Sequence, residues 1–209
     1  MPTRIEPLFA ALKSQHRAAL IAYITAGDPT PERTPQIVAA LERGGVDLIE
    51  LGVPFSDPIA DGPVIQAGAE RALKAGTTLR KVLEIAQTIR QTSQIPLLVF
   101  TYLNPAMRYG FEKLGRDAKA AGVDGCLLTD LSVEEAEPYV NSMREATSLP
   151  LAVGFGISTP EQAGAVAKMA DGVVVGSAFV RLLENHASDA QIEAFARSLR
   201  EGMDAGVDR

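Results

Sequence analysis

The sequence contains one cysteine, two histidines and no tryptophan, and this scarcity argues against several kinds of site. The lone cysteine, Cys126, excludes an internal disulfide framework and suits a reducing compartment, and its apolar surroundings predict that it packs in the core. Because His16 and His186 lie far apart and no cluster of ligands accompanies them, a zinc or iron site is not expected. Ser56 and Ser177 have no histidine at the spacing of a hydrolase triad. The sequence therefore predicts neither a metal centre nor a serine hydrolase.

The sequence also lacks an excess of positive charge and any long apolar run. Its net charge of −6 argues against nucleic acid or an anionic membrane as the main partner, whereas a small anionic substrate can still bind to local backbone dipoles. No apolar run approaches the ~20 residues of a membrane-spanning helix, and the N-terminus shows no signal-peptide pattern. With 46% hydrophobic residues and no linker or low-complexity tract, we expect one α/β domain over residues 1–209, in the cytoplasm.

What the sequence does contain is an alternation of short apolar runs with longer amphipathic stretches, which is typical of parallel βα units. Runs this continuously apolar indicate strands buried on both faces. The expected strands are Ala18–Thr25, Val46–Leu51, Ile95–Leu103, Val123–Thr129, Leu149–Phe155 and Gly172–Gly176. These make six βα units, fewer than the eight of a complete parallel barrel, which usually takes ~250 residues.

Local signals mark where the intervening helices begin and end. Thr30–Pro31 is expected to open one helix, and the spacing of Ser188 and Gln191 is that of a capping box. The sequence Gly45–Asp47 reads Gly-Val-Asp where a helix ends and a strand begins, and the same three residues recur at Gly122–Asp124. This recurrence favours repeated βα units over a solenoid, because no fixed short period runs through the chain.

The most informative stretch reads DLIELGVPFSDPIADG and covers Asp47–Gly62. Glu50 lies at the carboxyl end of an apolar strand, where ligands bind in parallel sheets and barrels. A carboxylate walled by apolar groups has a raised pKa and can exchange protons near neutrality, although a solvated or ion-paired strand-end glutamate is an equal alternative. The proline-stiffened loop can carry Asp61 back over Glu50, so that two carboxylates surround one ligand. Turn or helix-capping roles compete for Asp61, and a turn role is favoured for Asp57.

Two glycine-rich turns follow the last two expected strands. They read VGFGISTP at residues 153–160 and VVVGSA at residues 173–178. Glycine allows the backbone to approach a ligand closely, and the helix N-terminus that follows offers free N–H groups with a favourable dipole. A single such turn is weak support, since tight βα turns need glycine anyway. Two in succession, one of them carrying Ser177, predict a phosphate site like that of barrel enzymes.

Three further residues at strand ends have two readings each. Tyr23 and Tyr102 can line a pocket for a flat aromatic ring, or they can be ordinary core residues. Asp130 ends its strand in LLTDLS, where it either contacts ligand or begins the next turn.

Taken together, these motifs resemble the family of tryptophan synthase α subunits. The resemblance rests on ELGVPFSDPIADGP, preceded by YITAGDP at residues 23–29 and followed in order by LLTDLSVEE, GFGIS and VGSA, and it covers nearly the whole chain. It implies descent from an eight-stranded TIM barrel that cleaves indole-3-glycerol phosphate to indole and glyceraldehyde 3-phosphate. The implied reaction is a retro-aldol cleavage that needs no cofactor.

The resemblance also implies roles for individual residues. Glu50 matches the family's general acid–base carboxylate, and Asp61 the carboxylate that pairs with the indole nitrogen. Four residues match phosphate contacts or a pocket wall: Phe155, Gly156, Gly176 and Ser177. Three residues match positions near the interface with the β subunit: Pro54, Asp57 and Asn104.

The sequence departs from the family in length, because the resemblance implies that two βα units are missing between Asp130 and Leu149. The missing part corresponds to a mobile loop that closes over substrate, so we expect lyase activity to be severely reduced or absent. The six remaining units are expected to form either a reduced barrel or an opened, doubly wound (Rossmann-like) sheet, and exposed edges can be covered by a second copy in a homodimer. The alternative function is a non-catalytic, phosphate-binding scaffold that keeps the family fold.

Overall fold

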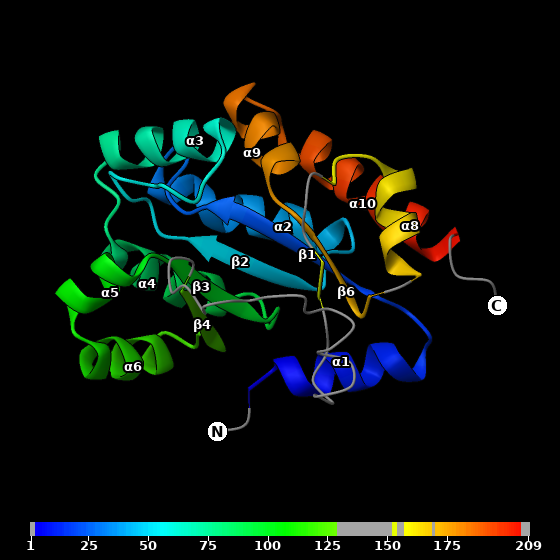
Figure 1. The fold of residues 1–209 in the computed structure, drawn as a ribbon, viewed down its shortest axis with the longest axis horizontal. Coiled ribbons are helices and arrows are strands. Elements are labelled where there is room, and N and C mark those ends of the chain that lie inside the picture. Colours follow the sequence, from blue (N-terminus) through cyan, green and yellow to red (C-terminus); the bar gives the residue numbers. More distant parts are fainter. Residues whose placement is uncertain (1–2, 129–151, 154–156, 169, 206–209) are drawn as a thin grey trace.

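The computed structural model describes residues 3–128, 152–153, 157–168 and 170–205, and the structural statements below concern these residues. Parallel strands and helices alternate along them (Figure 1). The strands are β1 (Ala19–Thr25), β2 (Leu48–Gly52), β3 (Leu97–Thr101), β4 (Gly125–Leu128), β5 (Ala152–Val153) and β6 (Gly172–Val175). The α-helices are α1 (Ile5–Ser14), α2 (Thr34–Arg43), α3 (Pro63–Lys74), α4 (Leu79–Arg90), α5 (Leu103–Tyr109), α6 (Phe111–Ala120), α8 (Pro160–Ala167), α9 (Ser177–Glu184) and α10 (Asp189–Ala205), and the 3-10 helix η1 spans Pro31–Arg33.

The described strands form one parallel sheet in the order β4-β3-β2-β1-β6-β5. From β1 to β4 each new strand is added on the same side of the previous one, and β6 follows β5 in that same direction. A doubly wound sheet reverses direction at a switch point, and this sheet does not. The prediction of an α/β fold with six parallel βα units is confirmed, and the strand order is that of a barrel wall.

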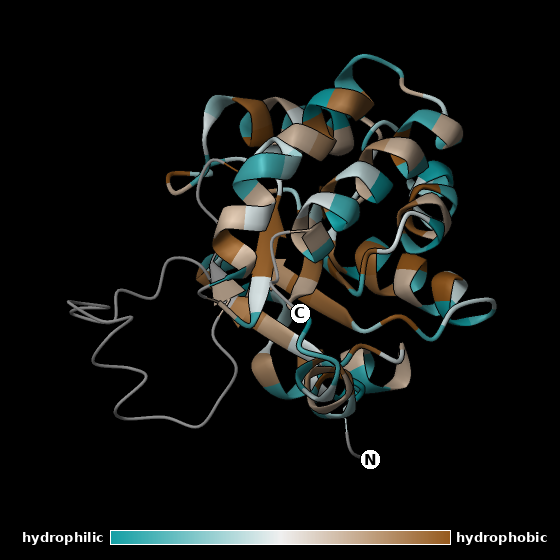
Figure 2. Cartoon of the chain, turned by 90° about the vertical axis from the view of Figure 1, so that its right-hand side faces the viewer, coloured by the Kyte–Doolittle hydropathy of each residue, from teal (hydrophilic) through white to brown (hydrophobic). Residues whose placement is uncertain are grey.

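The two faces of the sheet differ in what covers them, because successive side chains of a strand point to opposite sides. In β1, Leu20, Ala22 and Ile24 belong to the main core, which the surrounding helices cover. The alternate residues Ala19 and Ile21 belong to a second, smaller cluster on the opposite face. Apolar residues are concentrated on the strands and on the inward sides of the helices, and hydrophilic ones on the outer sides (Figure 2).

Helix α1 closes the amino-terminal end of that second face. Its Leu12 is buried with Ala19 and Ile21, and Ile5, Leu8 and Phe9 pack against the same cluster. These four residues lie on one face of α1, so the helix is amphipathic and turns its apolar side to the sheet. The carboxyl-terminal half of the same sheet face lies beyond the part that α1 packs against.

The first Gly-Val-Asp sequence ends in an aspartate that joins two strands. The carboxylate of Asp47 accepts hydrogen bonds from the backbone N–H of Leu20 at 2.8 Å and from Arg200 at 3.1 Å. Its own N–H donates to the carbonyl of Leu20, also at 2.8 Å. Arg200 additionally donates to the carbonyl of Ala18 at 2.9 Å, so α10 is tied to the start of β1.

The second Gly-Val-Asp sequence makes the same kind of contacts between β3 and β4. Asp124 accepts a hydrogen bond from the N–H of Leu97 at 3.0 Å and returns one to its carbonyl at 2.8 Å. Arg90 and Arg4 both pair with its carboxylate, at 2.9 and 3.0 Å. Burial alone would raise the pKa of Asp124, but the hydrogen bonds from Leu97 and Arg4 outweigh it and the pKa is lowered. The recurrence in sequence is therefore a recurring clamp at the amino-terminal ends of the strands.

The helix expected to open at Thr30–Pro31 begins there, with Pro31 as the first residue of the short η1, and it continues as α2 from Thr34. The expectation for Cys126 is wrong. Cys126 is exposed rather than packed in the core, because β4 lies at an edge of the sheet in the described residues. The capping box of Ser188 and Gln191 is confirmed, since each residue's side chain bonds the other's backbone N–H. None of the helices within the described ranges has the length and apolar content needed to cross a membrane.

Candidate active site

Glu50 lies in β2, on the face of the sheet opposite the helices. It is aligned with Tyr23 of β1, and its side chain alternates with those of Ile49 and Leu51, which belong to the main core. Only 7% of the residue is exposed. Burial removes the water that would stabilise the carboxylate, and the pKa of Glu50 rises from 4.5 to about 7. Of the two readings that the sequence allows, the structure gives the buried carboxylate with a raised pKa.

Tyr23 occupies the space beside Glu50 and packs edge-on against Phe100 of β3, with 5.0 Å between the ring centres. Its hydroxyl lies over Gly52: a Cβ atom on that glycine would come within 2.3 Å of the oxygen. The pKa of Tyr23 is raised, mainly by burial and also by the negative charges of Asp61 and Glu50. Tyr23 therefore lies within electrostatic reach of both predicted catalytic carboxylates.

Asp61 reaches the same region from the loop between β2 and α3. Burial raises the pKa of this half-buried carboxyl group, and a hydrogen bond with Tyr102 opposes that rise. The Tyr102 hydroxyl also accepts a hydrogen bond from the N–H of Ala60 at 3.0 Å, and its ring lies 5.1 Å from that of Phe55. The Asp61 carbonyl accepts a bond from Gln66 of α3 at 2.8 Å. The loop is thus fixed at Asp61 from both sides.

The glycine turn after β6 borders this group. Helix α9 begins at Ser177, which is exposed, and Gly176 precedes it. A Cβ atom on Gly176 would lie 3.4 Å from the Cβ of Tyr23, so the turn packs directly against the tyrosine. The start of α9 therefore lies beside Tyr23, and the free N–H groups of a helix N-terminus favour an anionic group.

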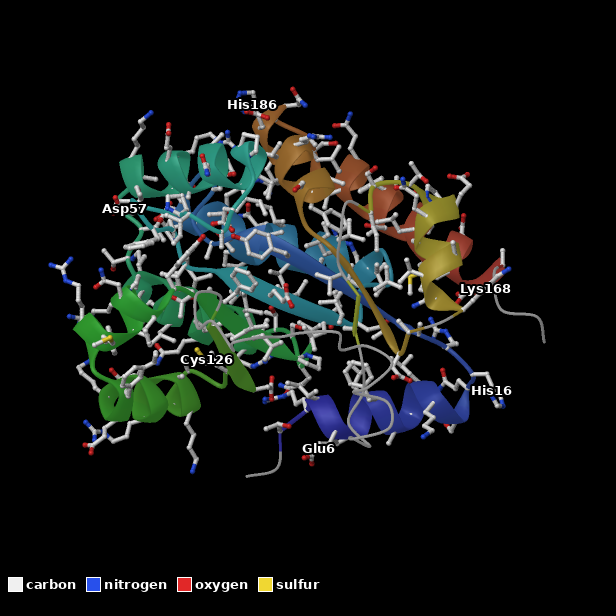
Figure 3. All side chains as sticks on the ribbon, in the orientation of Figure 1. Glu6, His16, Asp57, Cys126, Lys168 and His186 are labelled. Carbon is white, nitrogen blue, oxygen red and sulfur yellow. The ribbon has the colours of Figure 1, made fainter. Side chains whose placement is uncertain are left out.

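The three residues matched to a partner interface lie on the outer side of the same end of the sheet. Asp57 and Asn104 are exposed, whereas Pro54 is buried beneath the loop. Asp57 lies at the outer end of the loop before α3 (Figure 3). Its carboxylate accepts a hydrogen bond from Ser56 at 2.5 Å. Next to it, Ile59 is 86% exposed.

Some predicted site residues cannot be placed. Asp130, Phe155 and Gly156 lie outside the described residues. Within the described part of the chain, no group of three or more His, Cys, Asp or Glu side chains is arranged to hold a metal ion. Sequence reasoning missed Phe100 and Phe55, which complete the aromatic wall. For Phe100 a signal existed, because it shares the inward-facing period of two with Leu98 in β3.

The arrangement suits proton transfer on a flat, partly apolar ligand. One carboxylate with a pKa near neutrality can both accept and return a proton, and a second, with a different environment, can stay ionised and stabilise positive charge. Aromatic rings flank both carboxylates, and the start of α9 lies beside them for an anionic group.

Known proteins with the same sequence features were identified by comparison. The sequence model of the family described as "Tryptophan synthase alpha chain" matches residues 9–146 and 136–207. A tryptophan synthase alpha chain from Solibacter usitatus is 52% identical over 264 aligned residues, which cover 97% of this chain and 99% of the relative. One from Geotalea uraniireducens is 42% identical over 263 residues, covering 97% and 98%. The crystal structure of tryptophan synthase subunit alpha from Legionella pneumophila has a TM-score of 0.89 at 33% identity, covering 98% of this chain and 100% of that one.

These comparisons also bear on length. The 264 aligned residues exceed the 209 of this chain, so the Solibacter relative contains residues without a counterpart here. The family model matches in two segments that meet and overlap at residues 136–146. The break in the match falls within the interval between Asp130 and Leu149, where the sequence predicts that βα units are missing.

Proposed function

Because the chain belongs to the tryptophan synthase alpha chain family, we propose that it cleaves indole-3-glycerol phosphate to indole and glyceraldehyde 3-phosphate. The observation that carries this proposal is the buried Glu50, whose pKa of about 7 suits acid–base catalysis, together with Asp61, whose negative charge, like that of Glu50, acts on Tyr23. The reaction is a retro-aldol cleavage that uses no cofactor.

In the proposed mechanism Glu50 moves the proton. It first helps to protonate the indole ring carbon that carries the glycerol chain, which places a positive charge on the ring nitrogen. The Glu50 carboxylate then takes the proton from the glycerol hydroxyl next to the ring, and the hydroxyl becomes the aldehyde as the carbon–carbon bond breaks. The bonding electrons return to the positively charged ring and give neutral indole. Asp61 accepts the hydrogen bond of the indole N–H and stabilises the positive charge that develops there. The raised pKa of Glu50 supports both proton transfers at neutral pH.

The phosphate group is assigned to the turn after β6. Gly176 and the N–H groups at the start of α9 bind its oxygens, and the Ser177 hydroxyl donates a further hydrogen bond. Gly156 and Phe155 belong to the same proposed site by resemblance to the family. Tyr23 and Tyr102 line the pocket between the phosphate and the indole ring.

We further propose that turnover is reduced because the chain lacks residues that its relatives have. A missing closing loop admits water and loosens the substrate, and a displacement of ~1 Å costs on the order of 100-fold in rate. We therefore expect kcat/KM about 100-fold below that of the Solibacter usitatus relative.

The experiment is a steady-state assay of indole release from synthetic indole-3-glycerol phosphate. The released indole, which is uncharged, is extracted into an organic solvent away from the phosphorylated substrate and measured by its fluorescence, and the chain itself contributes no tryptophan fluorescence because it contains none. Glu50→Gln and Asp61→Asn should each lower kcat at least 100-fold, and Glu70→Gln, a carboxylate 71% exposed on α3, is the matched control. Turnover equal to that of the relative would refute the proposed reduction. Binding of glycerol 3-phosphate without any turnover would favour the non-catalytic scaffold.

As a partner we propose the β subunit of tryptophan synthase. Support comes from the exposed Asp57, Asn104 and Ile59 at the same end of the sheet as the site. Gel filtration of the chain with and without a β subunit from the same source tests this. A co-eluting complex is expected, and its loss with Ile59→Asp would locate the contact. Elution of the chain alone at twice its mass would instead favour the homodimer.

A further inference from the structure

Arg71 joins three elements around the candidate active site. Its guanidinium donates to both carboxylate oxygens of Asp28, each at 2.8 Å, in a bidentate pair. It also donates to Glu184 at the end of α9, at 3.3 Å. The Asp28 side chain is fully buried, whereas that of Glu184 is 45% exposed. A bidentate pair with one buried partner fixes geometry in a way that a single exposed contact does not.

The Asp28 side of this pair is rigid. Asp28 lies in the loop directly after β1, where its N–H donates to the carbonyl of Thr25 at 3.2 Å. The neighbouring Gly27 donates to the hydroxyl of Thr34, in α2, at 2.9 Å. The loop is therefore held by the sheet and by α2, and it offers a fixed point against which α3 can dock.

Helix α3 docks closely at that point. A Cβ atom on Gly68 would meet Val180 of α9 at 3.0 Å and the side chains of Asp28 and Thr25 at 3.1 Å each. Gly68 and Arg71 are three residues apart, so both lie on the same face of the helix. The close approach at Gly68 and the ion pair at Arg71 together fix the position and orientation of α3 on the loop.

The position of α3 is transmitted to Asp61. Gln66, in the first turn of α3, donates to the Asp61 carbonyl at 2.8 Å and reaches the Pro58 carbonyl at 3.4 Å. Arg71 lies five residues further along the helix than Gln66, which is about 7.5 Å at 1.5 Å per residue. A tilt of α3 at Arg71 is therefore carried by Gln66 to the loop that holds the carboxylate.

We infer that Asp28 and Arg71 form a positioning pair, which sets α3 and through Gln66 holds Asp61 at the distance where it binds the N–H of an indole ring. The pair itself touches no substrate. The inference rests on the proposed function only in assigning indole to Asp61. Phosphate binding at the start of α9 should depend on the pair far less than indole binding does, because Phe179 anchors that end of α9 in the core and Arg71 contacts the other end, at Glu184.

The test measures two ligands separately on the full chain. Indole binding is followed by indole fluorescence, and glycerol 3-phosphate binding by calorimetry. Asp28→Asn and Arg71→Lys, which both lose the bidentate charged pair, should weaken indole binding about tenfold and leave glycerol 3-phosphate within twofold. Glu184→Gln is the matched control and should change neither. Unchanged indole binding in Asp28→Asn and Arg71→Lys would overturn the inference.

A double variant separates positioning from stability. Arg71→Gln leaves the buried Asp28 carboxylate unpaired and should lower Tm, whereas Asp28→Asn combined with Arg71→Gln removes the unpaired charge and should restore much of it. Indole binding should stay weak in the double variant. If indole binding recovers together with Tm, the pair only stabilises the fold, and the inference is overturned. If the wild-type chain binds indole without turnover, only the proposed function fails; if it binds no indole, both fail.

Discussion

Replacing Glu50 with glutamine should stabilise the folded chain at alkaline pH while abolishing its proposed activity. The pKa of Glu50 rises from 4.5 to about 7 on folding because the carboxyl group is buried. At about 1.4 kcal/mol for each pH unit, this difference corresponds to a cost of about 3 kcal/mol for keeping the group ionised inside the protein. Glutamine has nearly the same shape and never ionises, so it avoids that cost.

The sign of the pH dependence follows from which state binds more protons. Between pH 4.5 and about 7 the folded chain keeps the Glu50 proton and the unfolded chain has lost it. Stability therefore falls as pH rises through this interval, and it levels off above it. The advantage of Glu50→Gln over wild type should grow from near zero at pH 4.5 to about 3 kcal/mol at pH 8.

Urea unfolding of both proteins at pH 4.5, 6, 7 and 8 measures this difference, and the comparison cancels the contributions of every other titrating group. Glu70→Gln again serves as the control, because its side chain is 71% exposed and should give a flat difference. A stability difference between wild type and Glu50→Gln that does not change with pH would refute the assignment of a buried carboxyl group with a raised pKa.

Three shorter predictions follow from other contacts. Gly52→Ala should lower the free energy of unfolding by ~1–3 kcal/mol in urea titrations, because its Cβ would lie 2.3 Å from the Tyr23 hydroxyl; an unchanged midpoint would contradict that contact. Asp124→Asn should cost about 3 kcal/mol at pH 7 by leaving Arg90 without its carboxylate partner. Because the pKa of Asp124 is lowered, the loss should shrink as pH falls through that pKa, and a loss that is constant down to pH 2 would argue against the clamp. The exposed Cys126 should react with one equivalent of a disulfide reagent in the native chain, and faster at higher pH because the thiolate is the reactive form and partial desolvation of the thiol raises its pKa; reaction only after unfolding would place it in the core.

The strands were predictable from the sequence because burial on both faces leaves a plain record of continuous apolar residues, as in β1 and β2. The roles suggested for Glu50 and Asp61 came from their places in one motif, at a strand's carboxyl end and in the loop that follows. The raised pKa of Glu50 agrees with the burial expected at that position, and the catalytic roles of both residues stay predictions. The strands and the two carboxylates were predictable because each depends on residues that are close together in the sequence.

What the sequence could not predict depends on residues far apart in the chain. The exposure of Cys126 follows from the edge position of β4, and an apolar run reads the same at an edge as at the centre. The pairing of Asp28 with Arg71 joins positions 43 residues apart, and neither residue type is unusual where it stands. The period of two in β3 could have placed Phe100 on the inward face, but its contact with Tyr23 depends on which strand lies beside β2, and the sequence does not show that.

The aspartate clamps at Asp47 and Asp124 imply a division of labour between the two ends of the sheet. Each clamp ties a strand to the strand beside it, and Arg200 and Arg4 bring in the two ends of the chain. The amino-terminal rim is thus held together by separate contacts, each between two neighbouring strands. Removal of a whole βα unit should leave the register of the remaining strand pairs unchanged. The ligand-binding loop of that unit, at the other rim, is lost with it. A change in chain length in this architecture should therefore reduce ligand binding and catalysis more than it reduces the stability of the fold.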